Sequence, residues 1–320
     1  MRILLTGGSG FVGKAVLERL AAMDGVEALA ALRHQPQSLP AGVSVHLFDD
    51  LGSEVAWPKQ SGPFDVVIHC ASRVHVMNEV AADPLAEFRK VNVQATLAFA
   101  RRAAAAGVRR FVFISSIKVN GEATEPGRPY HAQDVPGPQD PYGVSKREAE
   151  EQLRQLAAET GMELTIIRPV LVYGPGVKAN FHNMMRWLDK QVPLPFGAID
   201  NRRSLVALDN LVDLIVICCT HPGAANQTFL VSDGHDVSTT ELLRQMARAL
   251  GKPARLLPIP ASMLVLGANL LGRRALSQRL CGSLQVDITQ TCSLLSWTPP
   301  VTFEQALRKT AEHYLENKEK

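Results

Sequence analysis

The chain has 320 residues, of which 46% are hydrophobic, so it can bury a sizeable core in one large or two closely packed domains. Its net charge of +3 is too small to argue for nucleic acid binding. Five cysteines without a C-x-x-C pair indicate reduced thiols and a cytoplasmic location, and the sequence shows no metal-ligand spacing.

The first predicted strand, residues 2–6, follows Met1 so closely that no room is left for a signal peptide. A glycine-rich turn and an apolar-periodic helix to about residue 23 come next. The turn reads Gly7-Gly8-Ser9-Gly10-Phe11-Val12-Gly13. Strand, glycine turn and helix are the context in which a dinucleotide pyrophosphate sits on a helix N-terminus. The spacing is G-x-x-G-x-x-G rather than G-x-G-x-x-G, and a purely structural turn is the alternative.

Strands and helices then alternate along the first half of the chain. Strands are predicted at residues 28–32, 44–48, 65–70, 110–115 and 164–168, and helices at about 84–106 and 141–159. This alternation predicts an α/β fold with a doubly wound, parallel Rossmann-type sheet. Ligands bind such sheets beyond the carboxyl ends of the strands, where Ala71, Ser115, Ser116 and Arg168 fall.

The helix that begins at Pro141 carries Tyr142 and Lys146. Residues four apart share one helix face, so the phenol and the ammonium can point into one site. A nearby cation favours the phenolate, and lowering the phenol pKa by about 3 units would need roughly 4 kcal/mol. The spacing alone is weak evidence, because solvated surface residues show it too.

The second half predicts a smaller C-terminal lobe. This half of the chain contains a helix at 180–189, an apolar run at 205–208 before a helix capped near Asp209, a strand at 228–232, and helices opened by Ser238-x-x-Glu241 and Thr302-x-x-Gln305. Residues 1–175 with about 204–233 would form the dinucleotide-binding domain. Residues 176–203 with 234–320 would form the substrate-binding lobe. Residues 121–140, rich in Pro and Gly, are expected to form a loop over the site. The longest apolar run, 262–271, is too short to span a bilayer and predicts a core helix, with membrane-surface contact as the alternative.

Taken in order, these motifs resemble the extended short-chain dehydrogenase/reductases, also described as the NAD-dependent epimerase/dehydratase family. The resemblance covers nearly the whole chain and rests on residues 6–13, Asp50-Leu51, Asn92, Ser115-Ser116, Tyr142 with Lys146, Arg168-Pro169 and Tyr173-Gly174-Pro175. The chain is most similar to the nucleotide-sugar branch, including UDP-glucose 4-epimerase-like proteins. The run from Ser115 to Glu122 resembles bacterial 4-keto-6-deoxy-HexNAc reductases of O-antigen and polysaccharide sugar synthesis.

The resemblance implies a role for each matching residue. Tyr142 would be the acid/base, and Lys146 would bind the nicotinamide ribose and lower the Tyr142 pKa. Ser116 would hydrogen-bond the reacting sugar oxygen, with Ser115 as the alternative, and Asn92 would support the site through its backbone or a water. The implied cofactor-binding residues are Gly7, Gly10, Phe11, Val12, Gly13, Arg33, Asp50, Leu51, Ala71, Ser115, Tyr142, Lys146 and Pro169.

The implied substrate contacts are Ser116, Asn180 and Arg203, with Arg203 on the diphosphate. Arginine suits bidentate contact with phosphate oxygens. The further candidates for phosphate contact are Arg273, Arg274 and Arg279. The site residues named above also have structural interpretations. The two serines could cap the end of a strand, Asn92 could be a solvated amide, Asp50 could be a turn aspartate, and the arginines could be solvated surface residues.

The end of the second predicted strand departs from the NAD pattern. NAD enzymes place a carboxylate about 20 positions past the glycine loop, where it binds the ribose 2′-hydroxyl. Here Ala31-Leu32-Arg33-His34 occupies that place. Arg33 suits a 2′-phosphate, so we expect NADP(H) to be preferred, with NAD(H) possible. An exposed strand-end arginine without a ligand is the alternative.

We therefore expect an NADP(H)-dependent oxidoreductase acting at C4 of a nucleotide-diphosphate sugar, specifically a 4-ketoreductase of a UDP-4-keto-6-deoxy-HexNAc. The alternatives are a UDP-sugar 4-epimerase with tightly bound NAD and a non-enzymatic NADP-sensing regulator built on the same fold. The family implies a homodimer packed through the helices that contain Pro84 and Tyr142, without a membrane span.

Overall fold

The computed structural model describes residues 1–36, 38–58, 62–74, 83–125, 127–270, 278 and 280–318. Its larger sheet has seven strands in the order β3-β2-β1-β4-β5-β6-β9, and every pairing in it is parallel. The strands are β1 (Arg2–Thr6), β2 (Glu27–Leu32), β3 (Ser44–Leu47), β4 (Val66–His69), β5 (Arg110–Ile114), β6 (Glu163–Pro169) and β9 (Gln227–Val231). The predicted doubly wound parallel sheet is therefore confirmed.

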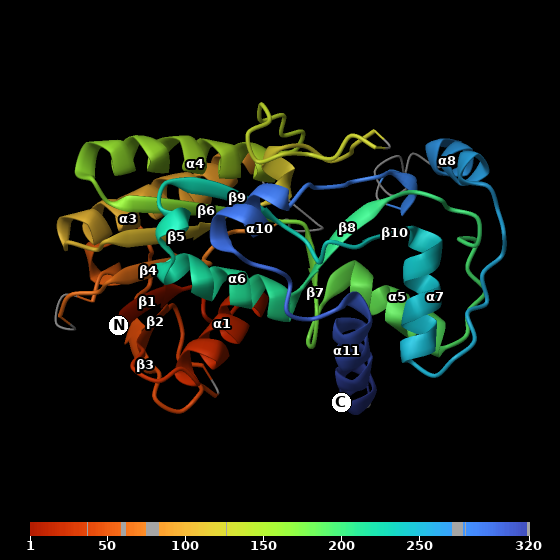
Figure 1. Cartoon of the computed structure of the whole chain (residues 1–320), viewed down its shortest axis with the longest axis horizontal. Coiled ribbons are helices and arrows are strands. Elements are labelled where there is room, and N and C mark those ends of the chain that lie inside the picture. The colour runs from red at the N-terminus through yellow and green to blue at the C-terminus, as the bar shows by residue number, and fades with distance from the viewer. Residues whose placement is uncertain are drawn as a thin grey trace.

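Helices cover both faces of this sheet (Figure 1). The helices α1 (Phe11–Ala21) and α6 (Leu208–Thr220) lie on one side, and α3 (Thr96–Ala105) and α4 (Pro141–Thr160) lie on the other. Strand residues alternate between the two layers, since successive side chains of a strand point to opposite faces. Thus Ile3 and Leu5 join the core with α1 and α6, whereas Leu4 joins the core with α3 and α4.

The helix predicted at residues 84–106 is interrupted by a π-helical segment. The α-helix α2 (Pro84–Arg89), capped by the Asp83 carboxylate on the Ala86 N–H at 3.1 Å, runs into a π-helical segment (Lys90–Ala95) and then into α3. Such π-helical turns occur frequently at functional sites. Asn92 lies in this segment and is 1% exposed.

Local sequence accounts for both ends of α4. The Asp140 carboxylate accepts a hydrogen bond from the Gly143 N–H at 2.7 Å, and Pro141 occupies the first helical position, where no N–H is needed. Gly161 ends the helix in the left-handed conformation with φ +75°. Tyr142 is thereby fixed in the first turn and Lys146 in the second.

A smaller lobe is built around a three-stranded sheet with the order β10-β8-β7. Its strands are β7 (Leu171–Tyr173), β8 (Arg203–Ala207) and β10 (Asp236–Val237), and its helices include α5 (Ala179–Asp189), α7 (Thr239–Ala249) and α11 (Phe303–Asn317). The helix α10 (Thr289–Leu295) packs instead against β9 of the larger sheet. The Thr302–Gln305 capping box is confirmed, and the Ser238 hydroxyl accepts from the Glu241 N–H at 3.0 Å. The helix α6 begins at Leu208 after Ala207, so Asp209 lies in its first turn rather than at its cap.

The prediction of a core helix at residues 262–271 is wrong for the part that the structure describes. The helix α8 (Ala261–Leu270) has no buried residue, and its Leu270 side chain is 80% exposed. The apolar composition of this segment predicted that its side chains would be buried. The helix lies instead at the outer corner of the smaller lobe (Figure 1). None of the described helices is long and apolar enough to cross a membrane.

Candidate active site

The glycine turn brings the N-terminus of α1 against the carboxyl ends of β1 and β4. Gly7 has φ +76°, and a Cβ added there would lie 2.5 Å from the backbone nitrogen of Ala71. A Cβ on Gly13 would lie 2.2 Å from the carbonyl oxygen of Gly7. Gly10 donates its N–H to that same oxygen at 3.0 Å, and α1 begins directly after it. The backbone N–H groups at the start of α1, where Phe11 and Val12 are half-buried, form a cradle that suits a dinucleotide pyrophosphate.

The predicted contacts to the nucleoside lie around the ends of β2 and β3. Arg33 follows β2 and is exposed to solvent. Asp50 is also exposed, and one of its carboxylate oxygens accepts from the Gly52 N–H at 2.9 Å, as in a turn aspartate. Leu51 beside it is buried. Pro169 ends β6 and pairs with Val231 of β9.

The Tyr142 phenol lies beside two serine hydroxyls, those of Ser72 and Ser116. Desolvation by burial raises the pKa of Tyr142 to about 12, although the two serines act in the opposite direction. Lys146 is not among the groups that cause this shift of the pKa, so its expected role in lowering the Tyr142 pKa stays a prediction. Burial is the larger effect, so Tyr142 is protonated at neutral pH and can serve as a proton donor.

Lys146 is buried beneath the end of β5. Its ammonium donates to the Ile114 carbonyl oxygen at 2.8 Å and lies 4.5 Å from the centroid of the Phe113 ring. Burial lowers the pKa of Lys146 to about 8, while Cys70 and Glu150 act to raise it. Lys146 lies on the same face of α4 as Tyr142, as its spacing predicted. Its hydrogen bond, however, goes to the backbone at the end of β5.

Asn92 connects three segments around Tyr142. Its carboxamide oxygen accepts from the Ser72 hydroxyl at 3.1 Å and from the Arg73 N–H at 2.8 Å. Its carboxamide nitrogen donates to the Arg73 carbonyl and to the Ser145 hydroxyl, each at 3.0 Å. The side chain therefore fixes the loop after β4 against α4. Ser72 was not predicted as a site residue, because its only signal in the sequence is its position just after a strand end.

Ser115 belongs to a buried network rather than to the Tyr142 site. Its hydroxyl donates to a Glu150 carboxylate oxygen at 2.5 Å. Glu150 is paired bidentately with Arg168 at 2.9 and 2.6 Å, and both side chains are almost fully buried. Arg168 also donates to the carboxamide oxygen of Asn120 at 2.9 Å. Of the two adjacent serines, Ser116 is the one placed beside the phenol.

The candidate substrate residues lie in the smaller lobe. Arg203 starts β8, is half-buried, and donates to the Gly282 carbonyl oxygen at 3.1 Å, while burial lowers its pKa. Asn180 is exposed in the first turn of α5. The remaining candidates lie outside the described residues: Arg273, Arg274 and Arg279.

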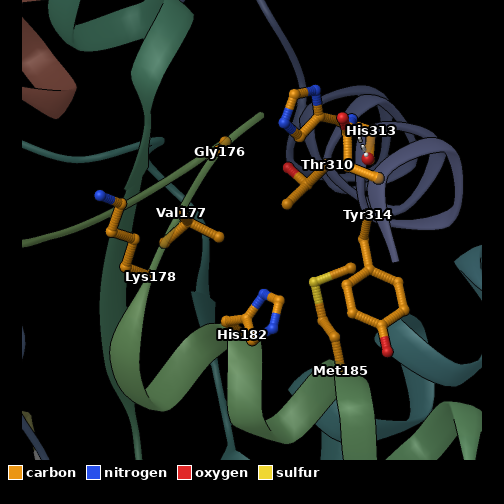
Figure 2. Close-up of a pocket in the computed structure, with 10 residues that line it drawn as sticks. Gly176, Val177, Lys178, His182, Met185, Thr310, His313 and Tyr314 are labelled. Carbon is orange, nitrogen blue, oxygen red and sulfur yellow. Dashed lines mark hydrogen bonds between the residues drawn. The ribbon is translucent and has the colours of Figure 1, made fainter. Parts of the chain in front are cut away.

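A surface pocket between α5 and α11 holds none of the predicted catalytic residues. Figure 2 shows His182 of α5 facing Tyr314 of α11, and their ring centroids lie 5.4 Å apart in an edge-to-face contact. The other notable histidine, His69, is fully buried and hydrogen-bonds Thr6 and Thr96, as expected for a core histidine. Across the described ranges, no group of three or more His, Cys, Asp or Glu side chains could hold a metal ion.

Comparison with known proteins extends this description. Residues 3–232 match the NAD dependent epimerase/dehydratase family. The chain is 48% identical to a Vibrio cholerae UDP-glucose 4-epimerase, covering 98% of this chain and 95% of that one. It is 29% identical to a Pseudomonas aeruginosa GDP-6-deoxy-D-mannose reductase, covering 96% and 95%. The solved structure of RMD from Pseudomonas aeruginosa complexed with NADPH has the same fold, with a TM-score of 0.77, 24% identity and coverage of 98% and 99%.

Proposed function

The chain belongs to the NAD dependent epimerase/dehydratase family, and we propose that it transfers hydride between NADP(H) and C4 of a nucleotide-diphosphate hexose. The relatives that the chain resembles over nearly its whole length include an epimerase and a reductase acting on nucleotide sugars. The chain is accordingly an enzyme of this family, and the alternative of a non-enzymatic regulator is set aside.

Our proposal is a 4-ketoreductase that takes a UDP-4-keto-6-deoxy-HexNAc. The observation that carries it is the exposed end of β2, where Arg33 follows Leu32 and no carboxylate is present in the sequence through His34. A cation there suits the 2′-phosphate of NADP(H), and a carboxylate to hold the 2′-hydroxyl of NAD is missing. A reductase must release its oxidised cofactor and bind a reduced one in each turnover. A site that binds NADP(H) reversibly therefore suits this reaction.

In this reaction the bound nicotinamide supplies the hydride that C4 of the keto sugar receives. Tyr142 donates its phenolic proton to the C4 oxygen, because its pKa of about 12 keeps the phenol protonated at neutral pH until the alkoxide develops. Ser116 hydrogen-bonds the same oxygen and stabilises the charge that develops on it. Lys146 binds the ribose hydroxyls, and Asn92 fixes Ser72 and α4 so that the phenol keeps its orientation.

Binding of the sugar nucleotide is assigned to the two lobes together. Arg203 would contact the diphosphate, and Asn180 would contact the substrate from α5. The choice of a 4-keto-6-deoxy-HexNAc rests on the run from Ser115 to Glu122. Within it, Lys118 pairs with Glu122 at 3.0 Å and with the Asp140 cap of α4, which ties this run to the catalytic helix.

A UDP-sugar 4-epimerase is the second candidate, and the Vibrio cholerae relative favours it. The same residues would then oxidise and re-reduce C4 with NAD that stays bound. Tyr142 would then act first as a base and afterwards as an acid on the same C4 oxygen.

The test is to incubate the purified protein with a UDP-4-keto-6-deoxy-HexNAc and NADPH or NADH, and separately with UDP-glucose and UDP-GlcNAc without added cofactor. Products are identified by NMR spectroscopy. We expect NADPH consumption with reduction at C4 of the keto sugar. Inversion at C4 of a UDP-sugar without cofactor, from protein that carries stoichiometric NAD, would overturn the reductase assignment.

A further inference from the structure

The helix α8 is apolar apart from Ser262 and Asn269, yet none of its residues is buried. Its side chains include Met263 and Leu266, each 62% exposed, and Leu270, 80% exposed. Leu257, just before the helix, is 50% exposed. A helix this hydrophobic is ordinarily buried in a core or a membrane. Exposed apolar surface gathered in one place marks an interaction site.

The sequence around α8 has a strong charge asymmetry. Residues 242–286 contain no Asp or Glu and seven Lys or Arg, so this segment carries +7. The whole chain carries +3, so all other residues together carry −4. The seven basic residues are Arg244, Arg248, Lys252, Arg255, Arg273, Arg274 and Arg279. The apolar helix therefore lies between basic residues on both sides in the sequence, within an otherwise acidic chain.

These two features together select one kind of partner. An anionic bilayer offers acyl chains for the apolar side chains and negative headgroups for the basic residues. A second copy would bring a like charge of +7 against this one, which opposes association. Nucleic acid would pair with the basic residues and leave the apolar helix in water. The ten described residues of α8 are too few to cross a bilayer, so they would lie in its interface.

We propose that α8 docks this enzyme on the surface of an anionic bilayer, with Met263, Leu266 and Leu270 entering the headgroup region. The proposal is independent of the reaction assigned above, because α8 contributes none of the residues of the Tyr142 site. It places the enzyme's smaller lobe against the membrane.

Vesicle flotation tests this with the full chain. One set of vesicles contains phosphatidylglycerol and phosphatidylethanolamine, and the other contains phosphatidylcholine alone. The double variant Leu266→Ser with Leu270→Ser removes apolar area from α8. The matched control is Val55→Ser, which alters a side chain of similar exposure (65%) in the short turn Glu54–Ala56 of the larger domain.

We expect the wild type to float with the phosphatidylglycerol vesicles and not with phosphatidylcholine, and salt to weaken this binding. The double variant should bind at least about tenfold more weakly, since two large apolar side chains are lost. The Val55→Ser variant should bind like the wild type, and both this variant and the double variant should keep wild-type turnover of a soluble substrate.

Absence of binding by the wild type, or equal binding by the double variant, would refute the proposal. A dimer that the double variant dissociates would instead assign α8 to contact between copies and would also refute it.

Discussion

The hydroxyl of Ser115 donates to the Glu150 carboxylate at 2.5 Å, whereas its neighbour Ser116 lies beside the Tyr142 phenol. Successive side chains of extended backbone point in opposite directions, so adjacent serines at the end of β5 cannot serve the same partner. The sequence left the choice between the two hydroxyls open. The structure places only Ser116 beside the group that we assign as the proton donor.

The two serines should therefore differ in what their loss affects. Ser116→Ala should lower kcat about 100-fold, because a hydrogen bond to the reacting oxygen is lost. Ser115→Ala should leave kcat near the wild-type value and lower the free energy of unfolding by roughly 1–3 kcal/mol, since buried Glu150 loses a donor. Steady-state kinetics and urea unfolding measure the two effects. The reverse pattern would exchange the roles of the serines.

Replacing Tyr142 with phenylalanine should abolish turnover while leaving cofactor affinity within a few fold. The change removes the proton donor and little binding surface. Tyr314→Phe, which removes a hydroxyl from α11, is the matched control and should retain wild-type turnover. Single-turnover kinetics and a fluorescence titration with NADPH would report both quantities. More than a tenth of the wild-type rate in Tyr142→Phe would rule out the assignment.

Cofactor binding should weaken as the pH is raised through about 8. Burial holds the pKa of Lys146 at about 8, below its ordinary value of 10.5, so the ammonium loses its proton there. The charge-assisted bond to the ribose then becomes a neutral one, which should raise the Kd about fivefold or more.

The Lys146→Ala variant is the control for this pH dependence. It should bind cofactor weakly at every pH and show no change near pH 8. Between about 8 and 10.5 the folded wild type binds fewer protons at Lys146 than the unfolded chain does, so this group makes the protein more stable as the pH rises. A loss of affinity in this range therefore cannot be ascribed to unfolding caused by Lys146. A flat Kd in the wild type would remove Lys146 from the cofactor site.

Arg203→Ala should raise KM for the sugar nucleotide more than KM for the cofactor. A charge-assisted contact with the diphosphate is worth roughly 1.5–3 kcal/mol, equivalent to a factor of about 10 to 150. Arg202→Ala is the matched control, because Arg202 precedes it in the sequence and is exposed. Equal effects of the two substitutions would mean that Arg203 makes no specific contact with substrate.

Local patterns were enough to predict most of the fold. The bounds of β1 follow from an apolar run before glycines, and those of α4 follow from Asp140, Pro141 and Gly161, each acting within a turn of its own position. The pairing of Tyr142 with Lys146 on one helix face is equally local. Such features need no knowledge of the distant parts of the chain.

What the sequence did not predict depends on contacts between distant segments. Ser72 reaches Tyr142 only because Asn92, 20 residues further on, fixes its loop to α4. The pKa of Tyr142 reflects burial by several elements, which a four-residue spacing cannot show. The exposure of α8 contradicts its composition, because nothing in the run itself specifies whether a neighbour covers it. The homodimer through α2 and α4 stays a prediction.

The cofactor preference separates the two candidate reactions, and Arg33 is the residue that decides it. With Arg33→Asp, the 2′-phosphate of NADPH would face a like charge, and the ribose hydroxyl of NADH would gain an acceptor. We expect the ratio of kcat/KM for NADPH over NADH to fall at least about tenfold, the equivalent of one charge-assisted contact.

His34→Asp is the matched control, since it adds the same carboxylate at the adjacent exposed position while keeping the Arg33 guanidinium. Equal shifts in both variants would indicate a general effect of negative charge at this end of the sheet. An unchanged ratio in Arg33→Asp, together with NAD that copurifies, would make Arg33 a surface residue and favour the epimerase, because an enzyme that regenerates its cofactor in each turnover gains nothing from releasing it.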